Sequence, residues 1–371
     1  MTLARTSRAA LIGAVALTLP LAACSSGKTA STPGGAATGA GGSSGAKVAF
    51  LMPDQASTRY EQHDAPGFKA AMSKLCNSCE VLYNNADGDA TKQQQQFNAA
   101  VTQGVKAIVL DPVDSTAAAS LVAQAQGKGI KVLAYDRPIP DAKVDFYVSF
   151  DNQAIGKSIA QSLIEHLKKT GVPTSKGILQ VNGSPTDAAA GLIKKGIHEG
   201  LQGSGYTTLA EYDTPAWEPT KAQQWVAGQI SRFPGKLAGI VAANDGTAGG
   251  SIAALKAANV SPIPPVTGND ATTAGLQLII AGDQYNTISK PSEIVAAAAA
   301  SVVVDLLNGK QPNPAGGGKL TTVFGAPTML FVPKVITKDN LKAEIIDTGI
   351  AKAADLCTGA YAAGCKTLGI S

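Results

Sequence analysis

Several predicted strands of this chain end in polar side chains. The strand ends carry Asp136-Arg137, Asn182-Gly183-Ser184, Asn244-Asp245, Asn269-Asp270 and Lys290. Because the strands of a parallel sheet all point the same way, such groups converge on one edge of the sheet. Carboxylates, amides and cations together suit a polyol, since each hydroxyl both donates and accepts a hydrogen bond.

Two aromatic residues fit the same chemistry. Tyr60 and Trp217 lie in the polar, irregular segments STRYEQ and TPAWEP, and flat rings stack well on the apolar faces of a pyranose. A plainer interpretation exists for each group. An Asp or Asn at a strand end often only caps the next helix, and either ring can be a packing residue. Five polar strand ends together favour a ligand site.

Motifs for catalysis are weak. Gly156-Lys157-Ser158 imitates the end of a phosphate-binding loop, but the motif needs a glycine at position 151, which is Asp. No G-x-G-x-x-G follows the first predicted strand, and no Cys–His nucleophile pair suggests itself. We therefore expect a protein that binds its ligand without turnover, cofactor or metal.

Strands and helices alternate along the chain, and this order must position the polar groups. Short apolar runs at 47–52, 80–85, 107–111 and 131–136 alternate with helical segments, and a second alternating set begins after Asp151. Such patterns predict parallel sheets covered by helices on both faces. The predicted fold class is α/β, with two doubly wound parallel-sheet lobes joined by three crossover strands.

The predicted lobes are discontinuous in sequence. Residues 47–149 with 291–325 are expected to form an N-terminal lobe, and residues 150–290 with 326–371 a C-terminal lobe. The stretch 132–152 is pivotal, because Pro138 and Pro140 stop a helix there and the next strand leads out of the first set. The three crossovers are expected near 149–152, 290–291 and 325–327.

The N-terminus carries the pattern of an export signal. Arg5 and Arg8 precede an apolar run at 9–19 that is too short to span a bilayer comfortably. Leu21-Ala22-Ala23-Cys24 resembles a bacterial lipobox, so we expect residues 1–23 to be removed and Cys24 to be lipidated. An ordinary signal peptide with an incidental cysteine is the alternative. Residues 24–46, rich in Gly, Ser, Ala and Thr, are expected to form a flexible tether.

The remaining cysteines form two close pairs, Cys76 with Cys79 and Cys357 with Cys365. Outside the cytoplasm we expect both pairs to be disulfides. Zinc would need nearby histidines, and the three histidines are widely spaced. A redox pair normally opens a helix, whereas 76–79 follows one. The net charge of +4 gives no reason to expect nucleic acid as a partner.

Six segments in order resemble the ribose-type (type I) sugar-binding components of ABC transporters. They are AYDRPIPDAKVDFYVSFDN, GSPTDAA, PAWEP, VAANDGTAGG, TGND and ISKP. The resemblance runs from about Lys47 to about Thr348. It implies two lobes that close on a monosaccharide. It also implies ligand contacts at Arg59, Tyr60, Asp136, Arg137, Asp187, Trp217, Asn244, Asp270 and Lys290.

Two positions depart from the xylose-binding members of this family, which have an asparagine at Ala189 and a tryptophan at Tyr60. A xylose-like pentose or a related aldose is expected. Together with the signal pattern and Cys24, the resemblance leads us to expect an exported, lipid-anchored monomer on the outer face of the cytoplasmic membrane, serving an ABC permease and ATPase. A sensor that presents sugar to a chemoreceptor or kinase is the alternative. A transcription regulator and an extracellular hydrolase fit less well.

Overall fold

The computed structural model describes residues 45–313 and 316–370. The predicted signal, Cys24 and the tether up to position 44 lie outside the described residues. Within these two ranges, no helix is long and apolar enough to cross a membrane.

The first lobe is built on a seven-stranded sheet in the order β10-β11-β5-β4-β3-β1-β2. All neighbouring strands are parallel except β10 and β11. The strands are β1 (Lys47–Met52), β2 (Glu80–Asn85), β3 (Ala107–Leu110), β4 (Lys131–Tyr135), β5 (Phe146–Phe150), β10 (Lys319–Val323) and β11 (Ala326–Phe331).

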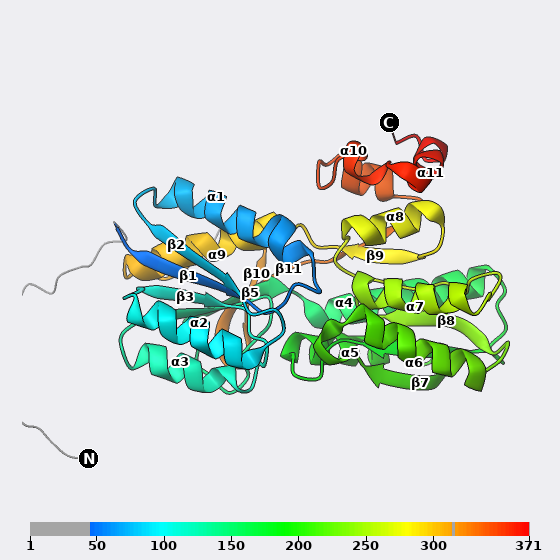
Figure 1. The fold of residues 1–371 in the computed structure, drawn as a ribbon, viewed down its shortest axis with the longest axis horizontal. Coiled ribbons are helices and arrows are strands. Elements are labelled where there is room, and N and C mark those ends of the chain that lie inside the picture. Colours follow the sequence, from blue (N-terminus) through cyan, green and yellow to red (C-terminus); the bar gives the residue numbers. More distant parts are fainter. Residues whose placement is uncertain (1–44, 314–315, 371) are drawn as a thin grey trace, which may run out of the picture. The chain divides into compact units, whose positions relative to one another are not determined.

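Helices cover both faces of this sheet, as Figure 1 shows. Helices α1 (Ala65–Leu75) and α9 (Ser292–Leu307) pack on one face, and α2 (Ala90–Thr102) and α3 (Ala118–Gln126) on the other. Successive strand residues point to opposite faces, so Val48 and Phe50 join one core and Ala49 and Leu51 the other. This explains why the inner strands β1, β3, β4 and β5 are buried along almost their whole length, whereas the edge strands β2 and β10 are polar and more exposed.

The second lobe repeats this arrangement around the parallel order β7-β6-β8. Its strands are β6 (Gly177–Asn182), β7 (Thr207–Asp213) and β8 (Leu237–Ala242), and β9 (Asn286–Ser289) pairs antiparallel with β12 (Lys334–Thr337). Between β8 and β9, residues 264–270 make a single parallel bridge, Ile240 to Val266. Helices α4 (Asn152–Lys169) and α5 (Ala188–Leu201) cover one face, and α6 (Pro219–Arg232) and α7 (Asp245–Ala257) the other.

Residues 156–158, which imitate the end of a phosphate-binding loop, lie in α4 where it packs against α5. A Cβ at Gly156 would lie 1.9 Å from the Ile193 carbonyl oxygen, and one at Gly196 would lie 2.0 Å from the Gln153 carbonyl oxygen. These two glycines let α4 and α5 approach closely. Residues 156–158 therefore have a structural explanation that involves no phosphate.

The C-terminal segment packs on α8 (Thr273–Ala281), a helix that the sequence analysis did not predict. The segment begins with a short helical turn, Lys342–Ile346, and α10 (Ala353–Leu356) and α11 (Ala362–Thr367) follow it. The disulfide Cys357–Cys365 closes this segment, and Cys76–Cys79 follows α1. Both predicted disulfides are therefore present.

The chain crosses between the lobes three times, and one crossing differs from the prediction. The first two lie between β5 and α4 and between β9 and α9. The third was predicted at 325–327, with residues 326–371 in the C-terminal lobe. Instead β11 pairs with β5 through Thr328–Tyr147 and its neighbours. The crossing therefore follows Phe331, at the Val332-Pro333 step into β12.

Candidate ligand-binding site

A small cavity between the two lobes gathers the residues that the sequence analysis selected. Its volume is about 20 Å³. All nine selected residues line it, namely Arg59, Tyr60, Asp136, Arg137, Asp187, Trp217, Asn244, Asp270 and Lys290. The other lining residues are Ser57, Asn152, Ala189, Ile193 and Asn269. The cavity lies at the carboxyl ends of the strands, as the parallel topology predicts.

Three of the lining residues have left-handed backbone conformations although none is glycine. The φ angles are 56° at Asp136, 58° at Trp217 and 100° at Asp270. Such conformations are unfavourable for L-residues and concentrate at ligand sites, where the surrounding structure holds them. The backbone around the cavity is therefore fixed at a cost in conformational energy.

Arg59 and Lys290 bind the carboxylates on one side of the cavity. Arg59 forms an ion pair with Asp64 at 2.8 Å and another, shorter one with Asp136, while its Nε lies 3.7 Å from Asp270. Lys290 Nζ lies 3.2 Å from Asp270 and 3.6 Å from Asp136. Burial alone would raise the pKa of Asp136, but Arg59 and Lys290 outweigh it and hold that pKa well below its ordinary value.

Arg137 joins the two lobes. Its guanidinium lies 2.5 Å from Asp54 Oδ2 and 3.5 Å from Asp111 Oδ1 in the first lobe, and 3.1 Å from Asp187 Oδ2 in the second. It also donates a hydrogen bond to the Pro112 carbonyl oxygen at 3.1 Å. Burial raises the pKa of Asp111 well above its ordinary value although Arg137 opposes the shift.

Two helix caps also line the cavity. Asp187 accepts a hydrogen bond from the Ala189 backbone N–H at 2.7 Å and one from Trp217 Nε1 at 3.0 Å. Asn244 caps α7 through the Thr247 backbone N–H at 2.8 Å. The plain interpretation as helix caps and the interpretation as cavity residues therefore both hold at these positions. A cap fixes the direction of its side chain, which pre-organises the site.

Asp245 anchors, through hydrogen bonds, the loop that contains Asp270. Its carboxylate accepts hydrogen bonds from the Thr272 backbone N–H at 2.8 Å, Thr287 Oγ1 at 2.7 Å and Gln284 Nε2 at 2.8 Å. Burial, followed by the negative charge of Asp270, raises the pKa of Asp245 to about 7. The loop is thus anchored on a carboxylate that is costly to ionise.

The sequence analysis missed three residues of this network, Asp54, Asp64 and Asp111, which pair with the two arginines. It placed Asn269 at a strand end but not among the ligand contacts, and Asn269 lines the cavity. Asp111 follows β3 directly and Asp54 lies just beyond β1. The strand-end rule applied elsewhere would have found both. Asp64 ends a helical turn, so no local pattern indicates its role.

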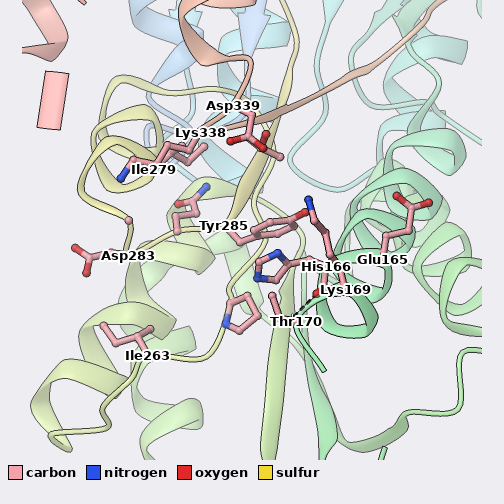
Figure 2. A pocket seen from close by; sticks show the side chains of 14 residues that line it. Glu165, His166, Lys169, Thr170, Ile263, Ile279, Asp283, Tyr285, Lys338 and Asp339 are labelled. Carbon is pink, nitrogen blue, oxygen red and sulfur yellow. Dashed lines mark hydrogen bonds between the residues drawn. The ribbon is translucent and has the colours of Figure 1, made fainter. Parts of the chain in front are cut away.

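A larger pocket of about 650 Å³ lies at the opposite edge of the second lobe. Figure 2 shows His166 and Tyr285 facing each other there, with ring centroids 4.2 Å apart. Acidic and basic side chains are mixed around it, and none of the nine selected residues lines it. It adjoins the amino end of β9 rather than the strand carboxyl ends. The smaller cavity is therefore the better candidate site.

The charges around the small cavity indicate what it can bind. Its cations Arg59, Arg137 and Lys290 are already paired with carboxylates, which are those of Asp54, Asp64, Asp111, Asp136, Asp187 and Asp270. An anionic ligand would meet more negative than positive charge. A neutral molecule rich in hydroxyl groups matches the donors, acceptors and two aromatic rings.

Known proteins share this fold and sequence pattern. Residues 48–311 match a family described as periplasmic binding protein domain. The D-xylose-binding periplasmic protein of Escherichia coli (strain K12) is 34% identical over 281 residues, covering 75% of this chain and 83% of that relative. A multiple sugar-binding periplasmic receptor of Rhizobium radiobacter is 28% identical over 330 residues, covering 83% of this chain and 92% of that relative.

Solved structures share the fold as well. An ABC transporter solute-binding protein from Clostridium phytofermentans, solved with bound β-D-glucose, matches with a TM-score of 0.75 and 26% identity, covering 84% of this chain and 99% of that chain. The chain therefore belongs to the periplasmic binding protein family and has its type I fold.

Proposed function

We propose that this protein captures a neutral monosaccharide in the cavity between its lobes and delivers it to an ABC importer. The observation that carries the proposal is the convergence of nine selected residues on one cavity whose cations are already neutralised. Relatives named for D-xylose and for multiple sugars support the ligand class. The chain is a binding protein rather than an enzyme, since its family and relatives are binding proteins.

Binding requires the lobes to part and close again. The cavity of about 20 Å³ has room for about one water molecule, so a sugar cannot enter this conformation. The Arg137–Asp187 ion pair and the hydrogen bond from Ser115 N to Thr186 O, 2.9 Å long, must open first. A sugar that touches both lobes then favours the closed form.

Position 189 bears on the identity of the sugar. Ala189 lines the cavity in the first turn of α5, where xylose-binding members of the family have an asparagine. A methyl group offers no hydrogen bond to a hydroxyl. We therefore propose a xylose-like pentose or a related aldose as ligand. At the ring position that faces Ala189, this sugar would carry a different substituent from xylose.

The cellular setting follows from the same proposal. After removal of residues 1–23, a lipid on Cys24 would hold the protein on the outer face of the cytoplasmic membrane. It would act as a monomer with an ABC permease and ATPase. A sensor is the second candidate, favoured by the relative named as a receptor. Neighbouring genes for a permease and ATPase, rather than for a chemoreceptor or kinase, would distinguish the two.

The direct test is isothermal titration calorimetry of the mature protein with D-xylose, L-arabinose, D-ribose, D-glucose, D-galactose and myo-inositol. At least one neutral sugar is expected to give saturable heat. D-glucuronate and D-glucose 6-phosphate should give none, because the carboxylates around the cavity repel them. The absence of heat with every neutral sugar would contradict the proposal.

Gly183→Ala is expected to weaken sugar binding by displacing Trp217. A Cβ at 183 would lie 2.1 Å from two Trp217 ring carbons, so the ring must move and lose its bond to Asp187. We expect a loss of about 10- to 100-fold in affinity, as for one buried hydrogen-bonded contact. Gly191→Ala is the control, because nothing lies within 4 Å of its Cβ. Equal affinities of the two variants in calorimetry would show that the position of Trp217 does not matter.

A further inference from the structure

We infer that the side-chain amide of Asn269 hydrogen-bonds a hydroxyl group of the ligand and helps to select the sugar. This inference rests on the function proposed above. Asn269 is 2% exposed and lines the small cavity. Its Oδ1 is buried without a hydrogen-bond partner in the part of the chain that the structure describes. Buried amide oxygens are rarely left unpaired, so this acceptor is suited to a donor that arrives with the ligand.

The backbone of Asn269 is fixed on both sides of the residue. Its carbonyl oxygen accepts a hydrogen bond from the Asp245 backbone N–H at 2.9 Å, and the next N–H, that of Asp270, donates to the Ile288 carbonyl oxygen at 3.1 Å. The main chain therefore cannot easily rotate away from the cavity, and only the side-chain torsions of Asn269 are left to adjust to a ligand.

Other polar groups of the cavity are already occupied by protein partners. Asp136 holds Arg59 and Tyr60, Asp187 holds Trp217, and Asn244 caps α7. A ligand must compete for those groups. Asn269 Oδ1 requires no such exchange, because it has no hydrogen-bond partner among the described residues. Its bond to a ligand hydroxyl would therefore be gained without losing an internal one.

The test compares Asn269→Ala with the wild-type mature protein by calorimetry. The probe is whichever of the six neutral ligands in the calorimetric test above binds the wild type most tightly. We expect Asn269→Ala to lose about 10- to 100-fold in affinity and to melt no lower than the wild type in the absence of sugar. The monodeoxy analogues of that probe complete a double-mutant cycle. One analogue should bind the wild type and Asn269→Ala equally, because it lacks the hydroxyl that Asn269 contacts.

The matched control is Gln180→Ala. Gln180 is a buried amide in the same lobe that does not line the cavity and donates to Thr208 Oγ1 at 2.8 Å, and its Oε1 also has no partner among the described residues. It should melt at a lower temperature and keep its affinity within about twofold. Unchanged affinity of Asn269→Ala, or an equal loss with every deoxy analogue, would overturn the inference alone. No binding of any probe by the wild type would contradict both the inference and the proposed function.

Discussion

Arg137→Ala is expected to abolish sugar binding and to lower the free energy of unfolding by about 3–5 kcal/mol, the usual cost of breaking a buried ion pair. The guanidinium is buried between Asp54, Asp111 and Asp187. Without it, carboxylates in both lobes lose their counter-charge, and both Asp111 oxygens already lack a hydrogen-bond partner among the described residues. Binding fails because the lobes lose the cation that joins them across the cavity.

Denaturant unfolding followed by circular dichroism, together with calorimetry, measures both effects. Lys131→Ala is the control, since the Lys131–Asp145 pair is 3.0 Å long but the Lys131 side chain is 44% exposed. It should change stability by no more than about 1 kcal/mol and leave affinity unchanged. Arg137→Lys should recover part of the stability and little of the affinity, because an ammonium cannot replace the planar fork. If Arg137→Ala were as stable as the wild type, the ion pairs of Arg137 would contribute nothing to the free energy of unfolding.

Asp270→Asn is expected to weaken sugar binding by at least about 100-fold, the scale of losing a charged hydrogen-bonding group from a binding site. The carboxylate lies 3.2 Å from Lys290 and 3.7 Å from Arg59, and it can accept from two neighbouring hydroxyls at once. An amide replaces one of those acceptors with a donor. Asparagine tolerates the φ of 100° at this position better than most residues, so the loop should keep its shape.

The stability of Asp270→Asn should remain close to that of the wild type, in contrast to Arg137→Ala. Two cations lose a partner, but the negative charge that helps to raise the pKa of Asp245 also disappears. Asp283→Asn in the same lobe is the control, because Asp283 pairs with Lys256 at the surface, away from the cavity. Calorimetry that finds Asp270→Asn within about threefold of the wild type would remove Asp270 from the binding site.

Sequence patterns predicted the convergence of polar groups within each lobe, because the carboxyl ends of parallel strands share an edge. Asp136 and Lys290 follow β4 and β9, which belong to different sheets, so their 3.6 Å approach also requires the two lobes to face each other. The partners inside this network could not be predicted in the same way. The contact of Arg137 with Asp54 depends on rotamers and on the packing of three strand ends, which no spacing in the sequence records.

The errors in the fold have similar physical causes. Helix α8 was missed because its residues, TAGLQLIIA, are too uniformly apolar to show a helical period. The lobe boundary was misplaced because MLFVPKVI is an apolar run interrupted only by Pro333-Lys334. Its two halves belong to different sheets, with β11 paired to β5 and β12 to β9. Pairing partners of short apolar strands are set by the tertiary structure rather than by local sequence.

The disulfide Cys357–Cys365 matters for how the protein is produced. Cys365 and Leu356 pack on Leu276 and Ile279 of α8, and that helix begins at the threonine that Asp245 holds. The disulfide therefore supports, through α8, the strand-end loop that contains Asp270 and Thr272. Recombinant material from a reducing cytosol is expected to lack this bond, so its affinities should be compared with those of protein in which Cys357–Cys365 is oxidised.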